Sequence, residues 1–295
     1  MQKADTLKRY KTRKLVWIYA FLLPSLAIFL MFYASPIFTI VATSFTNWDG
    51  FNAPVFSGFN NYARLFASPV FLESLKNLIA WSLIAATVHV GFGVLVAFVL
   101  FRRPPGWQVT RTVFMIPNVI SIAAWAMIYR YTFRNDIGIL NTILRVFDPD
   151  LEIHWFFEAP YAFWAVTLTW VFYSVVVTLI VMGDLMAIPQ SVRDAARIDG
   201  ASTWQFAWRV ELPLCRNAIG TGIIASIAAR IAMFEAVYLT TNGAGNTMNI
   251  PVILYRAVQD SDYSYANANA VIMLIVGLIT LWVVNRVFRM NEAIY

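Results

Sequence analysis

Five long runs of this sequence contain no charged residue, and they constrain the fold more than any other feature. They cover residues 15–44, 78–101, 112–129, 161–183 and 263–285. A sixth apolar stretch, residues 217–239, is interrupted only by Arg230 and Glu235. About 20 apolar residues in a helix cross the hydrocarbon core of a bilayer, and in lipid the backbone must pair its polar groups internally. The sequence therefore predicts six transmembrane helices.

The composition excludes several other classes of protein. Of the 295 residues, 60% are hydrophobic and 13% are charged, whereas a soluble globular chain is about 45–50% apolar and about 25% charged. The apolar content also argues against disorder. A single cysteine, Cys215, excludes an internal disulfide and a cysteine-rich metal site, and two histidines, His89 and His154, leave little for a histidine-based site.

The positions of Lys and Arg predict the orientation of the spans. Basic residues concentrate in the N-terminal tail, in the second-to-third and fourth-to-fifth connections and at the C-terminus, which share one side if there are six spans. Cytoplasmic loops are rich in Lys and Arg, so we expect both termini in the cytoplasm. The net charge of +6 then reflects topology, not nucleic-acid binding. The first run exceeds a signal-peptide core, so we expect an uncleaved helix that Pro24 and Pro36 kink or end.

The connection between the fourth and fifth runs carries two capping-box spacings. Ser191 and Asp194 form the first, and Ser202 and Gln205 form the second. Gly200 lies between them and can adopt the left-handed conformation that ends a helix. We therefore predict a helix over residues 192–199, a bend at Gly200 and a second short helix, which together form an elbow.

One face of the first of these helices is built from small residues. Val192, Ala195, Ala196 and Asp199 follow the spacing i, i+3, i+4, i+7. Alanines permit close approach of another surface, while the arginines of the helix lie on another face, where they can meet acids or lipid headgroups. Two interpretations follow from the residues alone: a knob that fits a groove of a partner, or an amphipathic helix that lies on the membrane.

The same segment resembles the EAA signature of the permease subunits of binding-protein-dependent ABC importers. Residues 194–201 read Asp-Ala-Ala-Arg-Ile-Asp-Gly-Ala, and Leu-Pro follows at residues 212–213; the carbohydrate branch has Glu-Ala-Ala-x-x-Asp-Gly-Ala and then Leu-Pro. Residues 58–62, 111–117, 135–141, 234–243 and 255–256 also resemble that branch, in order. The sequence departs from it at Asp194, where Glu is usual, and at Asn217, near a usual proline. It is most similar to the maltose-type first permease subunit.

The resemblance implies an all-α integral membrane protein with six transmembrane helices, the type I ABC importer permease fold, and cytoplasmic coupling helices. It implies a bacterial plasma (inner) membrane location. In this family the elbow is a coupling helix that sits in a cleft of a cytoplasmic ATPase subunit, and closure of the ATPase dimer on ATP rotates the spans. By this resemblance the contact residues are Asp194, Ala195, Ala196, Asp199 and Gly200.

The resemblance also implies domains and partners. We expect a basic cytoplasmic tail (1–14), a first transmembrane helix (15–45), an external loop (46–74), a permease core (75–290) with its coupling loop (187–213), and a C-terminal tail (291–295). The implied partners are a second permease subunit, an ATPase dimer, an extracytoplasmic solute-binding protein, a sugar or oligosaccharide, and membrane lipid. No lysine of the sequence follows a glycine, which excludes a phosphate-binding loop. The chain is thus expected to be non-catalytic and to bind no cofactor, with ATP and Mg on the partner ATPase.

Polar residues inside the third, fourth and fifth runs are candidates for a cargo path, because polar groups in a span usually face a cavity or a partner. Sugar sites combine aromatic faces with amides and hydroxyls. Asn118, Ser121 and Trp125 have the spacing of one helical face, and the maltose-type family lines its pocket from these three helices. The candidates are Asn118, Ser121, Trp170, Tyr173, Ser226, Arg230, Met233 and Glu235.

Other interpretations of these residues remain open. Trp125 and Tyr129 are also typical of an interfacial aromatic belt, and Ser226 can bond back to its own helix. Arg230 stands where the family has a neutral residue, which favours either an acidic cargo or an ion pair across the permease interface. The alternative function is a secondary solute transporter driven by an ion gradient, but we find no internal repeat. A membrane enzyme is disfavoured because the spans hold no catalytic constellation.

Overall fold

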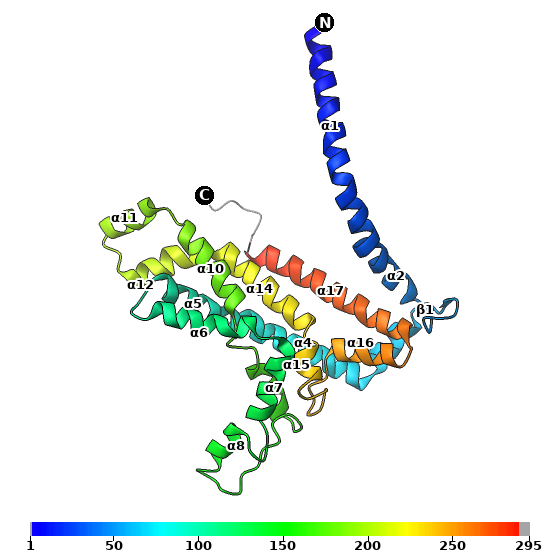
Figure 1. The fold of residues 1–295 in the computed structure, drawn as a ribbon, viewed down its shortest axis with the longest axis vertical. Helices are drawn as coiled ribbons and strands as arrows, with labels where there is room; N and C mark the ends of the chain where they lie inside the picture. The colour runs from blue at the N-terminus through cyan, green and yellow to red at the C-terminus, as the bar shows by residue number, and fades with distance from the viewer. Residues whose placement is uncertain (1, 289–295) are drawn as a thin grey trace.

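The computed structural model describes the backbone of residues 2–288 and the side chains of residues 14–288. The basic side chains before Lys14, Arg289 and the C-terminal tail at 291–295 lie outside the described residues. The described part is mostly helical; α1 projects away, and the other long helices form one bundle (Figure 1). Three helices are long and apolar enough to span a membrane, and three bent pairs raise the number of candidate spans to as many as six.

The N-terminal third holds the first two spans and a small hairpin. Helix α1 continues through a π-turn into α2, and the pair forms the candidate span Lys14–Thr43. Helices α4 and α5, joined by the π-turn η2, form the candidate span Pro69–Phe101. The elements are α1 (Gln2–Phe29), η1 (Leu30–Ala34), α2 (Ser35–Thr43), β1 (Thr46–Asn47), β2 (Val55–Phe56), α3 (Asn60–Ala67), α4 (Pro69–Ile84), η2 (Ala85–His89) and α5 (Val90–Phe101).

The rest of the chain completes the bundle. Its last helix, α17 (Tyr263–Phe288), is the third uninterrupted candidate span. The remaining elements are α6 (Trp107–Met115), η3 (Ile116–Val119), α7 (Ile122–Thr132), α8 (Ile139–Leu144), α9 (Tyr161–Leu168), α10 (Val175–Ala187), α11 (Gln190–Ile198), α12 (Thr203–Phe206), η4 (Ala207–Glu211), α13 (Leu212–Leu214), α14 (Arg216–Ile231), α15 (Glu235–Tyr238) and α16 (Ile250–Gln259).

Two features of this part of the chain add detail to the expected fold. The antiparallel pair β1–β2, with Thr46 opposite Phe56, adds a short hairpin to a fold predicted as all-α. The second span begins at Pro69 instead of residue 78, so the end of the predicted external loop is helical. Ser68 caps this helix by accepting a hydrogen bond from the Phe71 amide, and Pro69 takes a first-turn position where its missing N–H costs nothing.

The third, fourth and fifth apolar runs are not continuous helices, contrary to the expectation that each run is one helix. The third run bends by 104° between η3 and α7, where Pro117 removes a backbone donor and Ser121 caps the new helix. The fourth run is irregular at residues 169–174, between α9 and α10, and the fifth is irregular at 232–234, between α14 and α15. In the first run, by contrast, Pro24 lies inside α1 and Pro36 opens α2 without ending the span.

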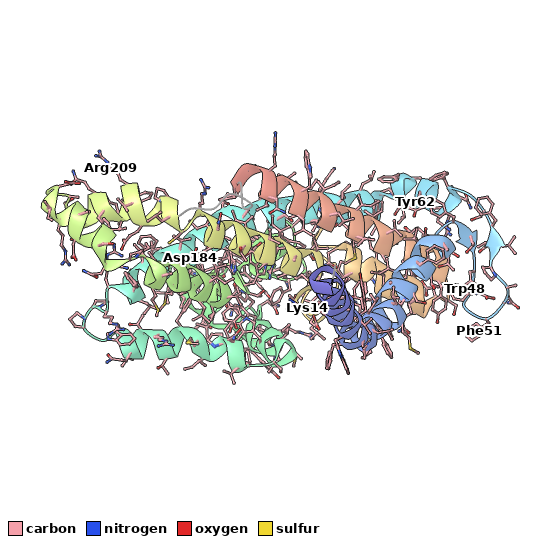
Figure 2. The ribbon with its side chains drawn as sticks, turned by 90° about the horizontal axis from the view of Figure 1, so that it is seen from above. Lys14, Trp48, Phe51, Tyr62, Asp184 and Arg209 are labelled. Atoms are coloured by element: carbon pink, nitrogen blue, oxygen red, sulfur yellow. The ribbon has the colours of Figure 1, made fainter. Side chains whose placement is uncertain are left out.

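The two ends of the bundle differ in chemistry. The elbow elements α11 and α12 lie at one end of the bundle, and the hairpin lies at the other (Figure 1). Figure 2 shows the basic side chain of Arg209 at the elbow end and the aromatic side chains of Trp48, Phe51 and Tyr62 at the hairpin end. The charge difference between the ends agrees with the orientation that the Lys and Arg positions predict.

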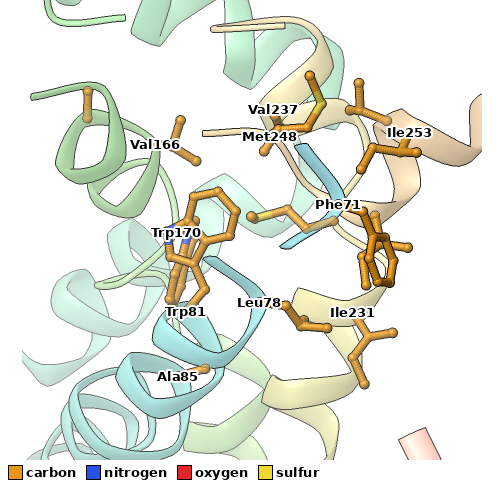
Figure 3. Packing of buried hydrophobic residues seen from close by; sticks show 14 of the residues in the cluster. Phe71, Leu78, Trp81, Ala85, Val166, Trp170, Ile231, Val237, Met248 and Ile253 are labelled. Atoms are coloured by element: carbon orange, nitrogen blue, oxygen red, sulfur yellow. The ribbon is translucent and has the colours of Figure 1, made fainter. Parts of the chain in front are cut away.

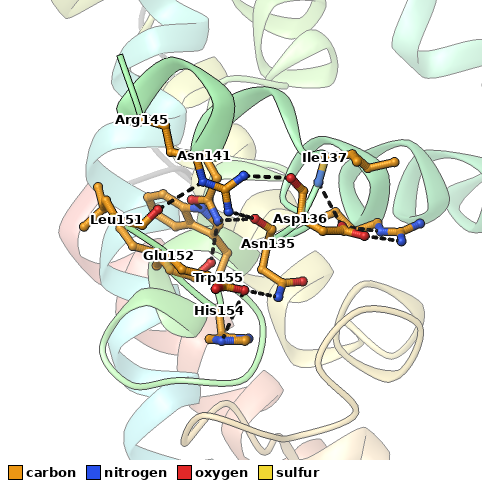
Figure 4. Close-up of polar contacts among 11 residues, drawn as sticks. Asn135, Asp136, Ile137, Asn141, Arg145, Leu151, Glu152, His154 and Trp155 are labelled. Carbon is orange, nitrogen blue, oxygen red and sulfur yellow. Dashed lines mark hydrogen bonds and ion pairs between the residues drawn. The ribbon is translucent and has the colours of Figure 1, made fainter. Parts of the chain in front are cut away.

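The connection between α7 and α9 is held by polar contacts (Figure 4). Arg145 donates to the carbonyls of Asn135, Asp136 and Leu151, and the fully buried Asn141 donates to those of Asn135 and Ile153. Trp155 in turn donates to the Asn141 side chain at 2.8 Å. At the surface of this loop, the Arg134 guanidinium lowers the pKa of Asp136 to about 2. The loop is therefore an ordered unit, although it has little regular secondary structure.

Two apolar clusters hold the bundle together. The larger lies towards the hairpin end and includes Phe71, Trp81, Trp170 and Met248 (Figure 3). The smaller lies towards the elbow and joins α5, α10 and α14 around Val177, Val181 and Leu185. Small residues let these three helices approach closely, as membrane helices require.

Gly93 provides a test of this close packing. A Cβ at Gly93 would lie 2.8 Å from the side chain of Val177 on α10, whereas a Cβ at Gly91 of the same helix would meet nothing within 4 Å. We expect Gly93→Leu to lower the thermal stability of the purified protein, because overpacking a filled interface costs about 1–3 kcal/mol. Gly91→Leu is the matched control and should leave the melting temperature unchanged. Equal melting temperatures for the two variants would contradict this packing.

Candidate functional site

The irregular segments of the three interrupted spans meet in one place. Tyr173, in the break of the fourth span, lies with its hydroxyl 2.8 Å from Asn118 Oδ1 in the break of the third. Trp170, in the same break, contacts the guanidinium of Arg230, two residues before the break of the fifth span, with 4.0 Å from Cζ to the ring centroid. The π-turn of the second span joins them, because the ring of His89 packs edge-on against Trp170 at 5.8 Å. We call Asn118, Trp170, Tyr173 and Arg230 the central cluster; Ser226 lies one turn before Arg230 on α14.

Side chains from neighbouring helices satisfy the carbonyls that the breaks leave free. In the fourth span, Trp125 donates to the Thr169 carbonyl at 2.8 Å, and His89 Nδ1 lies 3.0 Å from the Val171 carbonyl and 3.2 Å from that of Trp170. In the fifth span, Asn249 donates to the Met233 carbonyl. Non-helical backbone at membrane depth is tolerated where protein groups pair it or where it lines a cavity. The breaks are thus built into the packing of the bundle.

This pairing gives roles to residues whose sequence patterns were ambiguous. Trp125 and Tyr129 donate to carbonyls of the fourth span, so neither is merely part of an aromatic belt. His89 Nδ1 lies within hydrogen-bond distance of two carbonyls of the fourth span, which gives this residue a packing role. Asn249, which the sequence analysis did not select, caps α16 and pairs the break of the fifth span at the same time. Its signal was the position of an Asn immediately before Ile-Pro.

The central cluster is polar and incompletely paired. Trp170 Nε1, Ser174 Oγ and Ser226 Oγ are buried and have no hydrogen-bond partner among residues 14–288, so Ser226 does not make the bond to its own helix that the sequence left open as an alternative. Within the same residues, Arg230 stacks on Trp170 and makes a long contact, 3.5 Å, from Nη1 to Met233 Sδ. No acid of residues 14–288 forms an ion pair with Arg230. The described residues therefore supply a cation and unpaired donors but no counter-ion.

The other residues predicted to line the cargo path differ in their contacts and in their exposure. Asn118 does not share a helical face with Trp125, because the helix is broken after Val119; Ser121 is the N-cap of α7, one turn before Trp125. Met233 is buried beside Arg230. Glu235 opens α15 with an exposed side chain and does not pair with Arg230. Of the eight candidates, the structure thus brings Asn118, Trp170, Tyr173, Arg230 and Met233 into linked contact.

The elbow has the predicted helix–bend–helix form, with differences at its start. Helix α11 begins at Gln190 after Pro189, and Ser191 does not cap it. Gly200 has φ +72°, in the left-handed region, and the backbone amides of Gly200 and Ala201 close the helix on Arg197 and Ala196. The second capping box is confirmed, since Ser202 and Gln205 exchange both hydrogen bonds.

The face predicted for the elbow is divided by the fold. Val192 packs against the smaller apolar cluster, and Ala196 lines a cavity of about 200 Å³ between α11 and α5. Asp194, Ala195 and Asp199 instead face solvent. The face formed by Val192, Ala195, Ala196 and Asp199 is therefore not one continuous exposed surface. One half of it packs against the bundle, and the other half is exposed and available for contact with a partner.

Comparisons with known proteins agree with this architecture. Residues 89–291 match the family model described as "Binding-protein-dependent transport system inner membrane component". The chain is 32% identical over 273 residues to the probable ABC transporter permease protein YesP of Bacillus subtilis (strain 168), covering 89% of this chain and 87% of that protein. It is 26% identical to the trehalose/maltose transport system permease protein MalF of Thermococcus litoralis, with 92% of each chain covered.

A solved structure shares the fold. It is the crystal structure of a bacterial ABC transporter involved in the import of the acidic polysaccharide alginate, with a TM-score of 0.74 and 20% sequence identity. The alignment covers 97% of this chain and 100% of that one.

Proposed function

The chain belongs to the family of binding-protein-dependent transport system inner membrane components, and from this premise we propose that it is the first permease subunit of an importer for an acidic oligosaccharide. Membership makes it a multi-pass, non-catalytic permease subunit of an ABC transporter of the carbohydrate-uptake type. An ion-driven secondary transporter is therefore no longer a competing function.

The acidic nature of the cargo is inferred from Arg230. Its guanidinium stacks on Trp170 and forms no ion pair with an acid of residues 14–288. A charged residue inside a span is costly and marks a path for ions or substrate. A planar guanidinium binds carboxylates through two parallel hydrogen bonds. The unpaired Trp170 Nε1 and Ser226 Oγ supply further donors nearby. That a transporter of the same fold imports the acidic polysaccharide alginate supports the proposal.

The proposal assigns the elbow to contact with the ATPase. Asp194, Ala195 and Asp199 are the exposed part of α11 at one end of the bundle, Ala196 backs them, and Gly200 sets the bend. Small side chains permit the close approach that a groove requires, and the carboxylates can meet basic groups of the partner. ATP and Mg would be bound by the ATPase dimer, whose closure would move the elbow and switch the bundle between two states.

The proposal also covers the remaining partners and the location. A second permease subunit would cover the first span, whose most apolar window is 0% buried within this chain. The elbow and both termini would lie in the cytoplasm and the hairpin end outside the inner membrane, where a solute-binding protein would deliver the cargo. The difference in charge between the two ends supports this orientation.

The experiment is uptake by the complete importer, reconstituted in vesicles with its binding protein and ATPase. The probes are a uronate tetrasaccharide and a neutral glucose tetrasaccharide, each supplied with ATP inside the vesicles. We expect ATP-dependent uptake of the uronate probe and little uptake of the neutral one. Equal uptake of both, or preference for the neutral probe, would contradict an acidic cargo. Uptake without ATP would contradict an ABC mechanism altogether.

A further inference from the structure

Glu211 is an acid whose burial the proposed transport function does not explain. It is the last residue of the π-turn η4, and its side chain is 2% exposed. A buried carboxylate is unfavourable unless it is paired and hydrogen-bonded. The structure supplies that pairing from two separate elements, both near the elbow.

The two partners of Glu211 come from different parts of the chain. Arg102, at the end of the second span, lies 2.6 Å from Glu211 Oε2, and Arg193, on α11, lies 3.6 Å from Glu211 Oε1. Arg102 also donates to the Phe98 carbonyl one turn earlier on α5. One carboxylate thus joins the second span, the elbow helix and the start of the fifth span.

Arg193 extends this connection to the fourth span. Its Nη2 donates to the Leu185 carbonyl near the end of α10 at 2.7 Å, and its guanidinium lies 4.8 Å from the ring centroid of Phe101 on α5. The side chain is 20% exposed, so these contacts are shielded from water. The covalent chain links the elbow only to the fourth and fifth spans, whereas this group of contacts adds the second.

We propose that Glu211, held by Arg102 and Arg193, is a positioning residue that makes the elbow and the second span move as one body. This inference rests on the proposed coupling role of the elbow. A displacement of α11 by the ATPase would then reach α5 directly and, through the π-turn at His89, the central cluster around Trp170. The cavity of about 200 Å³ beside Glu211 means that apolar packing alone does not fix the elbow against α5.

The test compares Glu211→Gln with two variants of neighbouring arginines in the reconstituted importer. Arg102→Gln removes the ion pair between Glu211 and the second span but leaves Arg193 to neutralise Glu211, so it avoids an unpaired buried charge. Arg103→Gln is the matched control, because Arg103 lies at the same end of the span, stacks on the ring of Trp107 and forms no ion pair within residues 14–288. We expect Glu211→Gln and Arg102→Gln to lower the cargo imported per ATP hydrolysed by about two- to thirtyfold, and Arg103→Gln to leave it unchanged.

A distance measurement gives a readout that does not depend on the cargo. Spin labels at exposed Ile198 on the elbow and exposed Val99 on α5 report their separation with and without ATP and vanadate, while Cys215 is fully buried. We expect one narrow distance in the parent and in Arg103→Gln, and a broadened distribution in Glu211→Gln and Arg102→Gln. Unchanged transport per ATP together with unchanged distances in Arg102→Gln would overturn the proposal, even if Glu211→Gln fails to assemble. Failure of the coupling role itself would instead appear as normal ATPase binding and transport in Ala195→Asp.

Discussion

Arg230→Gln should abolish most uptake of the uronate tetrasaccharide while the complex still assembles. The substitution keeps a planar amide against Trp170 but removes the charge. A charge-assisted hydrogen bond contributes about 1.5–3 kcal/mol, so the expected loss is roughly 10- to 150-fold. The measurement is ATP-dependent uptake into vesicles, with co-purification of all subunits as the check on assembly.

Two further variants separate the effect of the Arg230 charge and shape from the effect of removing any arginine. Arg230→Lys keeps the charge without the planar fork and should retain an intermediate activity. Arg130→Gln is the matched control, since Arg130 is exposed and, within residues 14–288, forms no ion pair and makes a long contact, 3.5 Å, to the Leu239 carbonyl. If Arg230→Gln instead releases the second permease during purification, Arg230 serves the subunit interface and the acidic cargo loses its main support.

Ala195→Asp should disconnect the importer from its ATPase. Ala195 is exposed on α11, and a carboxylate placed in a close protein contact without a partner costs about 3–5 kcal/mol, or more than about a hundredfold in affinity. We expect uptake to fall to background and the ATPase to be lost on purification, while membrane insertion persists. Thr110→Asp adds the same charge at an exposed position of α6 and should change neither.

Gly200 offers a second test of the same contact. Its φ of +72° disfavours a β-branched side chain at about 1–3 kcal/mol, whereas asparagine tolerates this region. A Cβ at Gly200 would meet nothing within 4 Å, so only the backbone conformation is at issue. Gly200→Val should therefore reduce uptake strongly, and Gly200→Asn should not. Normal uptake and normal cargo-stimulated ATP hydrolysis in both Ala195→Asp and Gly200→Val would rule out the coupling role.

The sequence was sufficient to predict the apolar runs and the elbow, because local rules control both. Runs without charge have few alternatives in lipid, and Gly200 and the Ser202–Gln205 pair act over a few residues. The breaks were missed in the third, fourth and fifth runs because hydropathy does not report helix continuity. Only Pro117 gave a local signal, and the break at residues 169–174 depends on donors as distant as His89 and Trp125.

The candidate site was predictable to the same limited extent. Residue type alone identified Trp170 and Arg230, since a large aromatic and a cation inside spans are conspicuous. Their stacking could not be foreseen, because it requires two broken helices to meet. Glu211 was overlooked for a similar reason: its partners stand 109 and 18 positions away in the chain, and no spacing rule links such residues.

The bare first helix has a consequence for how cells must make this protein. The most apolar window of the span Lys14–Thr43 is 0% buried, and only the end of the span, α2, packs against α17. A subunit made alone therefore leaves most of this helix exposed to any other helix it encounters. Synthesis of this chain and the second permease subunit in equal amounts would limit such mispairing. Copies without a partner subunit would be exposed to degradation by membrane proteases. Accumulation of the lone chain should therefore depend on how much of the counterpart is present.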